Sequence, residues 1–394
     1  MRRRERIGVW LKNRERKKTA RLRFVSVLLL FLFASTSCAA DDTRGNPAAH
    51  LLPGEFASEH WEFTTRFDSG HLLFAEFLIT NIGLGDRNAA ASGHIVTPDG
   101  NTYRFTNGRR ESHWTLSSDR LRIEIGASVL DLHDPAYQIQ VNKRNVRVNL
   151  RFRPDGPAVW AEAFSPPGYT LDLLAAAVPV EGTLWVKGMT EPVTVHGTLA
   201  ATHSWVNEAG SSLVLRRIEF FALQENFPLY SVDLTTPKGS RIQWMVVKQQ
   251  GKRVDESHTF ELSLGGQARE PRDPGYEVPG AFHVKSAELE GQVRLERVLV
   301  RNDPLAALPQ PLHFLVALAL DLRPRRVWAL SPFEVFSSTD PSPAEHGSLR
   351  IQGTGVTAVT FLNPMPVSQP KVAAWISAVS QVPQRPDYSC EASR

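Results

Sequence analysis

Hydrophobic and polar residues alternate one for one over many short stretches of this chain. In the clearest case, from Val146 to Arg153, every second residue is apolar. Such period-two alternation is typical of strands that bury one face and expose the other. We therefore predict that Val146, Val148, Leu150 and Phe152 point inward and that Arg147, Arg151 and Arg153 point outward. The same alternation recurs at 121–125, 193–195, 260–264 and 349–353.

Turn-forming residues separate these stretches. Proline and glycine stand together at 98–100, 154–156, 237–239 and 271–275. Short strands that repeat about every 8 to 15 residues are typical of β-barrels and β-sandwiches. One helix is predicted, from Lys371 to Val379. The sequence therefore predicts an all-β protein, and its length favours two domains or one double-sized β unit.

The first forty residues have the three zones of a signal peptide. A strongly basic region runs to Arg23, an apolar run follows from Phe24 to Phe33, and small residues follow to Ala40. The apolar run is about half the length that a membrane-spanning helix requires. We expect either cleavage after Ala40 or lipid attachment to Cys38, which would give a membrane association. A later start site and a twin-arginine variant at Arg2 to Arg4 also fit the long basic region.

Removing this leader changes the charge of the chain. Residues 1–40 carry 11 of the 45 Lys and Arg residues and 2 of the 41 Asp and Glu residues, so the remainder has a formal charge near −5. No basic, aromatic-rich stripe is left, and we expect no nucleic-acid partner. Cys38 and Cys390 are the two cysteines, so the fold depends on its core rather than on disulfides. We expect a location in the periplasm or cell envelope.

Motifs of the common enzyme classes are absent from the sequence. It has no His-Glu-x-x-His, Gly-x-Ser-x-Gly or Cys-x-x-Cys motif, no phosphate-binding loop and no dinucleotide fingerprint. The 12 histidines show no metal-ligand spacing apart from a loose match at His196 and His203. We predict neither a metal site nor a cofactor.

Two local motifs stand out. The first is Glu59-His60-Trp61-Glu62-Phe63. The second begins with a hairpin at 182–188, continues through Val195-His196-Gly197 and ends at His203-Ser204-Trp205. On a strand, His203 and Trp205 share one face because they lie two residues apart.

With these two motifs, residues 55–365 resemble the hydroxyneurosporene synthase (carotenoid 1,2-hydratase, CrtC) and AttH group of lipocalin-like proteins, which includes predicted secreted hydrolases. Residues 59–63 look like the early Glu-Trp-Trp-Tyr-Phe signature of that group, with His60 and Glu62 in place of two aromatics. Residues 202–205 look like its Asp-His-x-Trp motif, with Thr202 where an acid is common. The resemblance implies two consecutive lipocalin-like antiparallel β-barrels with an apolar cavity. Together with the leader at 1–40, the linker-like composition of 41–54 and the predicted C-terminal helix and tail at 371–394, it gives barrels at 55–205 and 206–370.

The resemblance also implies site residues. Members of the group handle isoprenoids and other hydrophobic molecules, and the enzymes among them hydrate a carbon–carbon double bond or guide pericyclic chemistry. A Tyr-x-Asp pair is the suspected acid of the hydratases. Tyr230 matches it, whereas Asp233 is displaced by one residue and falls on the opposite strand face unless a bulge restores it. Acid-base candidates are therefore His203, Tyr230 and Asp233, and the ligand-binding candidates are Trp61, Trp185, Trp205 and Trp244. Alternatively, these aromatics fill a barrel core.

Two functions stay open. The favoured one is an exported lipocalin-like protein that binds a hydrophobic small molecule. The alternative is a hydratase or isomerase that acts on a double bond, and a structural envelope protein is a third possibility. Under both of the first two, His203, Trp205 and Tyr230 are expected to point into one apolar pocket of roughly 300 to 1,000 Å³.

Overall fold

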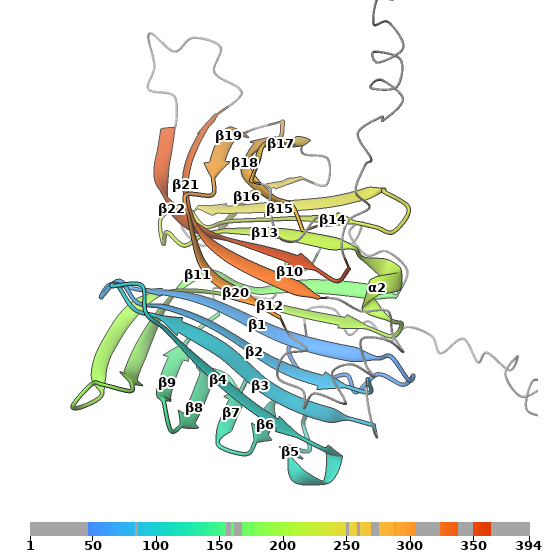
Figure 1. Cartoon of the computed structure of the whole chain (residues 1–394), viewed down its shortest axis with the longest axis vertical. Helices are drawn as coiled ribbons and strands as arrows, with labels where there is room; N and C mark the ends of the chain where they lie inside the picture. Colours follow the sequence, from blue (N-terminus) through green and yellow to red (C-terminus); the bar gives the residue numbers. More distant parts are fainter. Residues whose placement is uncertain are drawn as a thin grey trace, which may run out of the picture. The chain divides into compact units, whose positions relative to one another are not determined.

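The computed structural model describes residues 46–82, 86–154, 159–160, 168–249, 252–257, 261–268, 276–287, 289–303, 324–337 and 350–363 (Figure 1). The predicted leader with Cys38 and the predicted helix over 371–379 lie outside these residues, so both stay predictions. Among the described residues, no helix has the length and apolar character needed to cross a membrane.

The first sheet is antiparallel and contains the strands up to residue 206. Its order is β4-β3-β2-β1-β12-β11-β9-β8-β7-β6-β5, with β10 on the side of β11. A single 3-10 turn, η1 (Glu111–His113), precedes β5. The strand bounds are β1 Ser58–Phe67, β2 Leu72–Thr80, β3 Asn88–Val96, β4 Thr102–Arg109, β5 Thr115–Leu116, β6 Arg122–Ile125, β7 Ser128–Asp131, β8 Tyr137–Lys143, β9 Val146–Phe152, β10 Val159–Trp160, β11 Tyr169–Val186 and β12 Val193–Val206.

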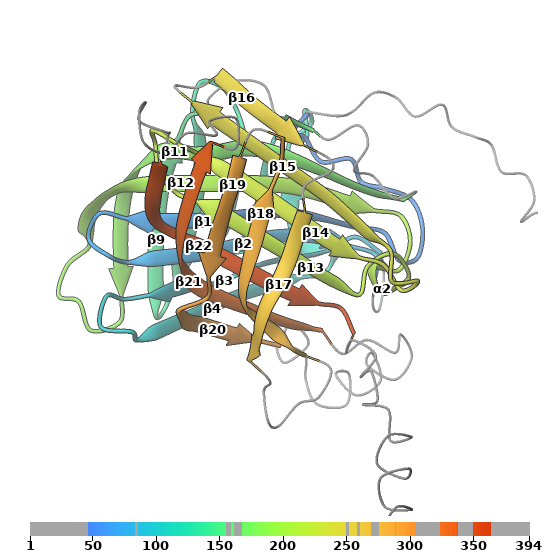
Figure 2. The ribbon, with the colours of Figure 1, turned by 90° about the horizontal axis from the view of Figure 1, so that it is seen from above.

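The second sheet is also antiparallel and follows a short helix, α2 (Gly210–Leu213). Its order is β16-β15-β14-β13-β22-β21-β19-β18-β17, with β20 on the side of β21. The last strand, β22, therefore lies between β13 and β21, as Figure 2 shows. The strand bounds are β13 Arg216–Ala222, β14 Leu229–Thr235, β15 Arg241–Gln249, β16 Lys252–Ser257, β17 Glu261–Ala268, β18 Val278–Lys285, β19 Leu289–Arg294, β20 Arg297–Asn302, β21 Arg325–Ser337 and β22 Arg350–Phe361.

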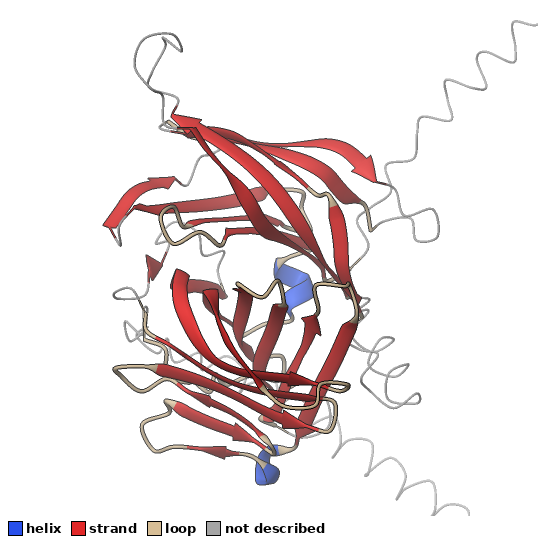
Figure 3. Cartoon of the chain, turned by 90° about the vertical axis from the view of Figure 1, so that its left-hand side faces the viewer, coloured by secondary structure: helices blue, strands red, loops and turns tan. Residues whose placement is uncertain are grey.

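These two sheets confirm the predicted all-β class. Figure 3 shows that most of the described chain is strand, and each sheet is a curled, antiparallel half-barrel. Strand β9 has the predicted orientation, because its apolar residues Val146, Val148, Leu150 and Phe152 are buried while its arginines are exposed. The predicted turn at 237–239 joins β14 to β15, and Gly239 adopts a φ of +81° that glycine tolerates without strain.

The apolar side chains form three layers. One layer fills the inner face of the first sheet and includes Trp61 and Phe63. A second layer lies between the two sheets, where Phe74 of β2 packs on Trp328 of β21. A third layer lies within the second sheet around Phe220. Strand β1 thus buries both faces, and its alternation sends odd-numbered residues to the inner face and even-numbered residues toward the second sheet.

Candidate functional site

The two sequence motifs meet in the structure. Strands β1 and β12 pair antiparallel, with Glu59 opposite Trp205 and Trp61 opposite His203. All four residues lie on the inner face of the first sheet, since they continue the alternation of Phe63 on β1 and Ala201 on β12. Segments separated by about 140 positions in the sequence therefore build one cluster, which we call the histidine cluster.

The Glu59 carboxylate is the centre of the histidine cluster. Its Oε1 lies 2.8 Å from Nε2 of His203 and 2.8 Å from Nδ1 of His50. The backbone N–H groups of His50 and Leu51 donate to the same carboxylate at 3.0 and 3.3 Å. The side chains of Glu59, His50 and His203 are all buried, and that of His203 has no exposed surface.

Aromatic rings enclose His203. The indole of Trp61 stacks on the imidazole with a centroid distance of 4.6 Å and an interplanar angle of 12°. The indole of Trp205 lies 4.8 Å away, and the ring of His50 stacks at 5.2 Å. Trp61 donates its indole N–H to the carbonyl of Pro47. Three planar faces and one carboxylate therefore fix the position and the rotation of this imidazole.

Burial and hydrogen bonding set the charge states in this cluster. Burial alone would raise the pKa of Glu59, but hydrogen bonds from His203 and His50 outweigh it and lower the pKa to about 2. Burial lowers the pKa of His203, although Glu59 opposes that shift. At neutral pH an ionised carboxylate thus faces a neutral imidazole, whose proton is on Nε2. The other nitrogen, Nδ1, is buried and has no hydrogen-bond partner among the described residues.

The segment 46–54 supplies His50 and packs against the first sheet. Ala49 is 2% exposed and belongs to the inner apolar layer, and its N–H donates to the carbonyl of Arg120 at 3.0 Å. The composition of this segment predicts a flexible linker, and this prediction is wrong for residues 46–54, which pack against the first sheet. The difference arises because a distant carboxylate, Glu59, holds the backbone of His50 and Leu51.

A second polar cluster lies between the two sheets, and we call it the arginine cluster. Glu62 of β1 accepts hydrogen bonds from Arg217 of β13 at 2.5 Å and from Arg326 of β21. Arg217 also reaches Glu219, at 3.0 Å. Burial would raise the pKa of Glu62, but the charges of Arg217 and Arg326 lower it to about 2. Permanent cations therefore keep Glu62 ionised.

Tyr230 belongs to the arginine cluster. Its hydroxyl donates to Oε1 of Glu219 at 2.9 Å, and its ring meets Trp244 edge to face at 5.6 Å. Burial raises the pKa of Glu219 despite the opposing charge of Arg217. The structure thus places a buried carboxyl group with a raised pKa beside the phenol of Tyr230, whose ring in turn contacts the indole of Trp244.

The three predicted acid-base residues are not brought together. His203 faces the inner side of the first sheet, whereas Tyr230 lies in the layer between the sheets. Strand β14 pairs on both sides without a register shift, so no bulge returns Asp233 to the face of Tyr230. Asp233 instead accepts hydrogen bonds from Arg241 and Gln243 at 2.6 and 2.7 Å. The expectation of one shared pocket for His203, Trp205 and Tyr230 is therefore wrong.

The four predicted ligand-binding tryptophans also separate. Trp61 and Trp205 flank His203, and Trp244 contacts Tyr230. Trp185 is half-buried on the outer face of the first sheet, where the guanidinium of Arg147 covers its ring at 4.8 Å. Its neighbours Leu184 and Val186 occupy the inner face, so alternation sends Trp185 outward. An interior binding role for Trp185 does not fit this position.

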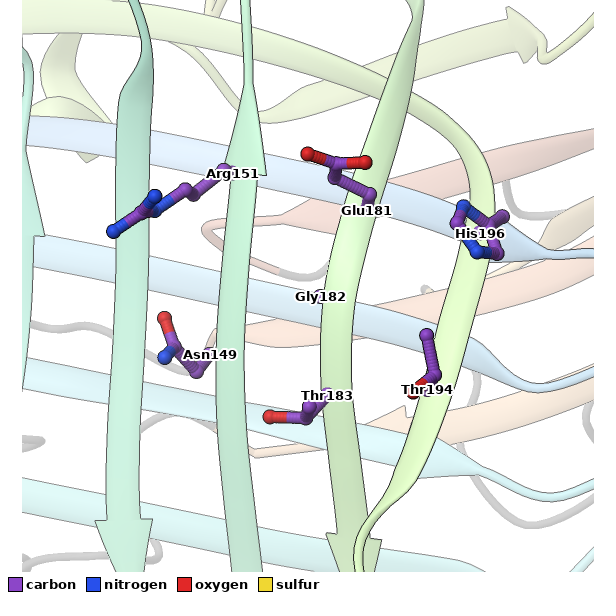
Figure 4. Close-up of a pocket in the computed structure, with 7 residues that line it drawn as sticks. All are labelled: Asn149, Arg151, Glu181, Gly182, Thr183, Thr194 and His196. Atoms are coloured by element: carbon purple, nitrogen blue, oxygen red, sulfur yellow. The ribbon is translucent and has the colours of Figure 1, made fainter.

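A depression of about 230 Å³ lies on this same outer face (Figure 4). It forms over Gly182, where a Cβ atom would come within 1.9 Å of the carbonyl oxygen of Asn149. Arg151, Glu181 and His196 form one row across its three strands. Apart from Gly182 its lining residues are of polar types with exposed side chains, so the depression is part of the solvated outer face.

The sequence did not reveal His50, Glu219 or the two buried arginines. Their roles arise from pairings between distant segments, such as Glu62 with Arg326, which lie 264 positions apart. A buried-charge pattern on β13, where Arg217 and Glu219 interrupt an apolar strand, was the available signal for two of them.

The comparisons with known proteins rest on structure. No family model matches the chain, and no curated protein matches it. The structure of an AttH-type protein from Nitrosomonas europaea superposes with a TM-score of 0.56 at 15% identity, covering 79% of this chain and 94% of that one. This chain has the AttH-type lipocalin-like fold.

Two further structures share the AttH-type fold. One is CghA with Sch210972, with a TM-score of 0.55 at 11% identity, covering 82% of this chain and 96% of that one. The other is kievitone hydratase from Nectria haematococca, with a TM-score of 0.54 at 11% identity, covering 80% of this chain and 94% of that one. These matches confirm the resemblance predicted from the two motifs, and at such identities they establish the fold alone.

Proposed function

We propose that this protein binds a hydrophobic small molecule beside His203 and Trp205. The observation that carries the proposal is the unpaired Nδ1 of His203, a polar atom buried among aromatic rings. A buried polar atom without a hydrogen bond costs about 1 to 3 kcal/mol. Such atoms are rare in folded proteins, and a bound molecule is one reason for their presence.

The tautomer of His203 defines the chemical class of the ligand. Because the ionised Glu59 accepts from Nε2–H, Nδ1 carries a lone pair and accepts a hydrogen bond. The complementary ligand has an apolar body that packs on Trp205 and a hydroxyl group that donates to Nδ1. The fold supports this proposal, since the CghA crystal structure contains a small molecule, Sch210972.

Ligand binding by the His203→Ala variant tests the proposal. We use retinol as the probe, because it is an apolar polyene with one hydroxyl group, and follow quenching of tryptophan fluorescence. Loss of one hydrogen bond should weaken binding by roughly 5 to 10-fold. Retinal, which has no hydroxyl donor, should bind more weakly than retinol to the wild type and equally to the variant.

The matched control is His196→Ala, because His196 lies on the same strand but is exposed on the outer face. It should bind retinol like the wild type. Mass spectrometry of small molecules extracted from natively purified protein identifies the natural ligand. If His203→Ala lowers only the melting temperature and leaves retinol binding and co-extracted molecules unchanged, His203 is structural and the proposal is wrong.

A second candidate function is a hydro-lyase that acts on a double bond, as the name of kievitone hydratase suggests for that protein. The specific observation is the buried carboxyl group of Glu219, whose pKa is raised and which accepts a hydrogen bond from Tyr230, while the ring of Tyr230 contacts Trp244. Alkene protonation creates a carbocation, which aromatic faces stabilise. In this case Glu219→Gln should lower turnover by roughly 100-fold to 10,000-fold with binding retained. Equal turnover in the wild type and the variant would remove Glu219 from this role.

A further inference from the structure

We propose that His50, Glu59 and His203 form a binding site for a divalent transition metal ion of the zinc class. The site goes beyond the proposed ligand binding and does not depend on it. It would tie three separate parts of the chain together: the segment 46–54, strand β1 and strand β12.

The ligand atoms have the separations that a metal ion requires. Nδ1 of His50, Oε1 of Glu59 and Nε2 of His203 all lie within 4.8 Å of one another, and the carboxylate oxygen is 2.8 Å from each nitrogen. In a tetrahedral site, metal–ligand bonds of about 2.0 to 2.2 Å place neighbouring ligand atoms about 3.3 to 3.6 Å apart. A small shift of each side chain therefore admits an ion at the centre of the three atoms.

The charge of the cluster also favours a cation. Glu59 is ionised and almost fully buried, and its hydrogen-bond donors in the described part of the chain are two imidazoles and two backbone amides. No lysine or arginine of the described residues donates to it, whereas Glu62 has two arginines. A buried carboxylate with imidazole and amide donors is a stronger cation ligand than one already neutralised by guanidinium groups.

Both imidazoles can adopt the tautomer that metal binding requires. Coordination through Nδ1 of His50 and Nε2 of His203 moves each proton to the remote nitrogen. The remote atoms, Nε2 of His50 and Nδ1 of His203, have no hydrogen-bond partners among the described residues, so the shift breaks no bond there. With metal bound, Nδ1 of His203 becomes a donor, and the preferred ligand group changes from a hydroxyl to a carbonyl.

The donor set indicates the class of metal. Two imidazoles and one carboxylate are ligands of Zn²⁺, Co²⁺ and related ions, and three protein ligands leave a fourth position for water or a ligand. Calcium and magnesium prefer sites built from oxygen atoms. We therefore expect Zn²⁺ and Co²⁺ to bind and Ca²⁺ and Mg²⁺ to bind at least 100-fold more weakly.

Metal titration of the full chain, prepared without a polyhistidine tag or chelator, tests the proposal. Calorimetry with Zn²⁺ should give one site per chain, and Co²⁺ should give visible absorption bands from imidazole coordination. His50→Gln should weaken Zn²⁺ binding at least 100-fold, while the exposed control His196→Gln should bind like the wild type. His50 lies outside the strands, so its replacement leaves both sheets intact.

Nitrogen NMR of the wild type provides a second measurement that needs no variant. Zn²⁺ should shift Nδ1 of His50 and Nε2 of His203 and leave the nitrogens of His196 unchanged. The proposal is overturned if Zn²⁺ moves neither signal, or if His50→Gln binds Zn²⁺ like the wild type. In either case Glu59 with its imidazoles is a hydrogen-bonded structural cluster, and retinol binding by the metal-free wild type still decides the proposed function separately.

Discussion

Glu59 and Glu62 are both buried acids of strand β1, but they lie three residues apart and face opposite sides of the first sheet. Glu62 meets the permanent charges of Arg217 and Arg326, whereas Glu59 meets the imidazoles of His50 and His203. In both cases the carboxylate stays ionised, with a pKa of about 2. The two sets of donors differ in whether they can exchange tautomers, accept hydrogen bonds or bind metals.

In the arginine cluster, the charges of Arg217 and Arg326 stay fixed. Guanidinium groups do not lose their protons at accessible pH, so Glu62 has the single role of joining the two sheets. Imidazoles, by contrast, can exchange tautomers, accept hydrogen bonds and bind metals. The histidine cluster therefore keeps side chains that can change their hydrogen bonds inside a packed sheet. For this reason we assign ligand binding to it and a structural role to the pairing of Glu62 with Arg217 and Arg326.

Glu62→Gln should produce the largest loss of stability. The variant removes one of the two carboxylates that Arg217 and Arg326 share and leaves Glu219 as their counter-ion, which costs up to about 3 to 5 kcal/mol. Denaturant titration measures the free energy of unfolding of the variant and the wild type. The control is Glu334→Gln, which breaks the exposed pair with Arg350 and should change stability little. An equally small effect of both variants would contradict the structural role of Glu62.

Acid should weaken the layer between the sheets through His94. Burial, together with the charges of Arg104 and Arg326, lowers the pKa of His94 from 6.5 to about 4. In the unfolded chain the imidazole takes up a proton below pH 6.5, but in the folded protein it stays neutral to about pH 4. The contribution of the neutral His94 to the free energy of unfolding is therefore fully present above pH 6.5. It is lost as pH falls toward 4, and the free energy of unfolding decreases by up to about 3 kcal/mol.

The matched variant is His94→Gln, which cannot take up a proton. The difference in unfolding free energy between wild type and variant should change steadily between pH 6.5 and 4 and stay constant above pH 7. A constant difference across the whole range would show that His94 titrates in the folded protein as it does in the unfolded chain.

The fold could be predicted from the sequence because its signal is local. Alternation on β9 fixes which residues point inward, and turn residues mark where strands end. The same rule correctly separated Asp233 from the face of Tyr230. The same alternation indicates an outward side chain for Trp185, because its neighbours Leu184 and Val186 are both apolar.

The candidate site could be predicted in part. His203, Trp205 and Trp61 belong to recognisable motifs, yet nothing local shows that the motifs pair across β1 and β12. His50 lies in a segment with the composition of a linker, and only its contact with Glu59 gives it a role. Spacing rules for metal ligands work within one strand or helix, so they do not detect a set drawn from three distant segments.

The central claim is that the histidine cluster binds the ligand and that Glu62 stabilises the fold. It is tested most directly by measuring retinol affinity and unfolding free energy on the same preparations of His203→Ala and Glu62→Gln. We predict that His203→Ala loses roughly 5 to 10-fold in retinol affinity, because it removes the acceptor nitrogen. Glu62→Gln should lose up to about 3 to 5 kcal/mol of stability, while its folded fraction keeps the wild-type affinity. A folded Glu62→Gln protein that binds retinol as weakly as His203→Ala, or a His203→Ala protein with unchanged affinity, would contradict the assignment of function to the histidine cluster.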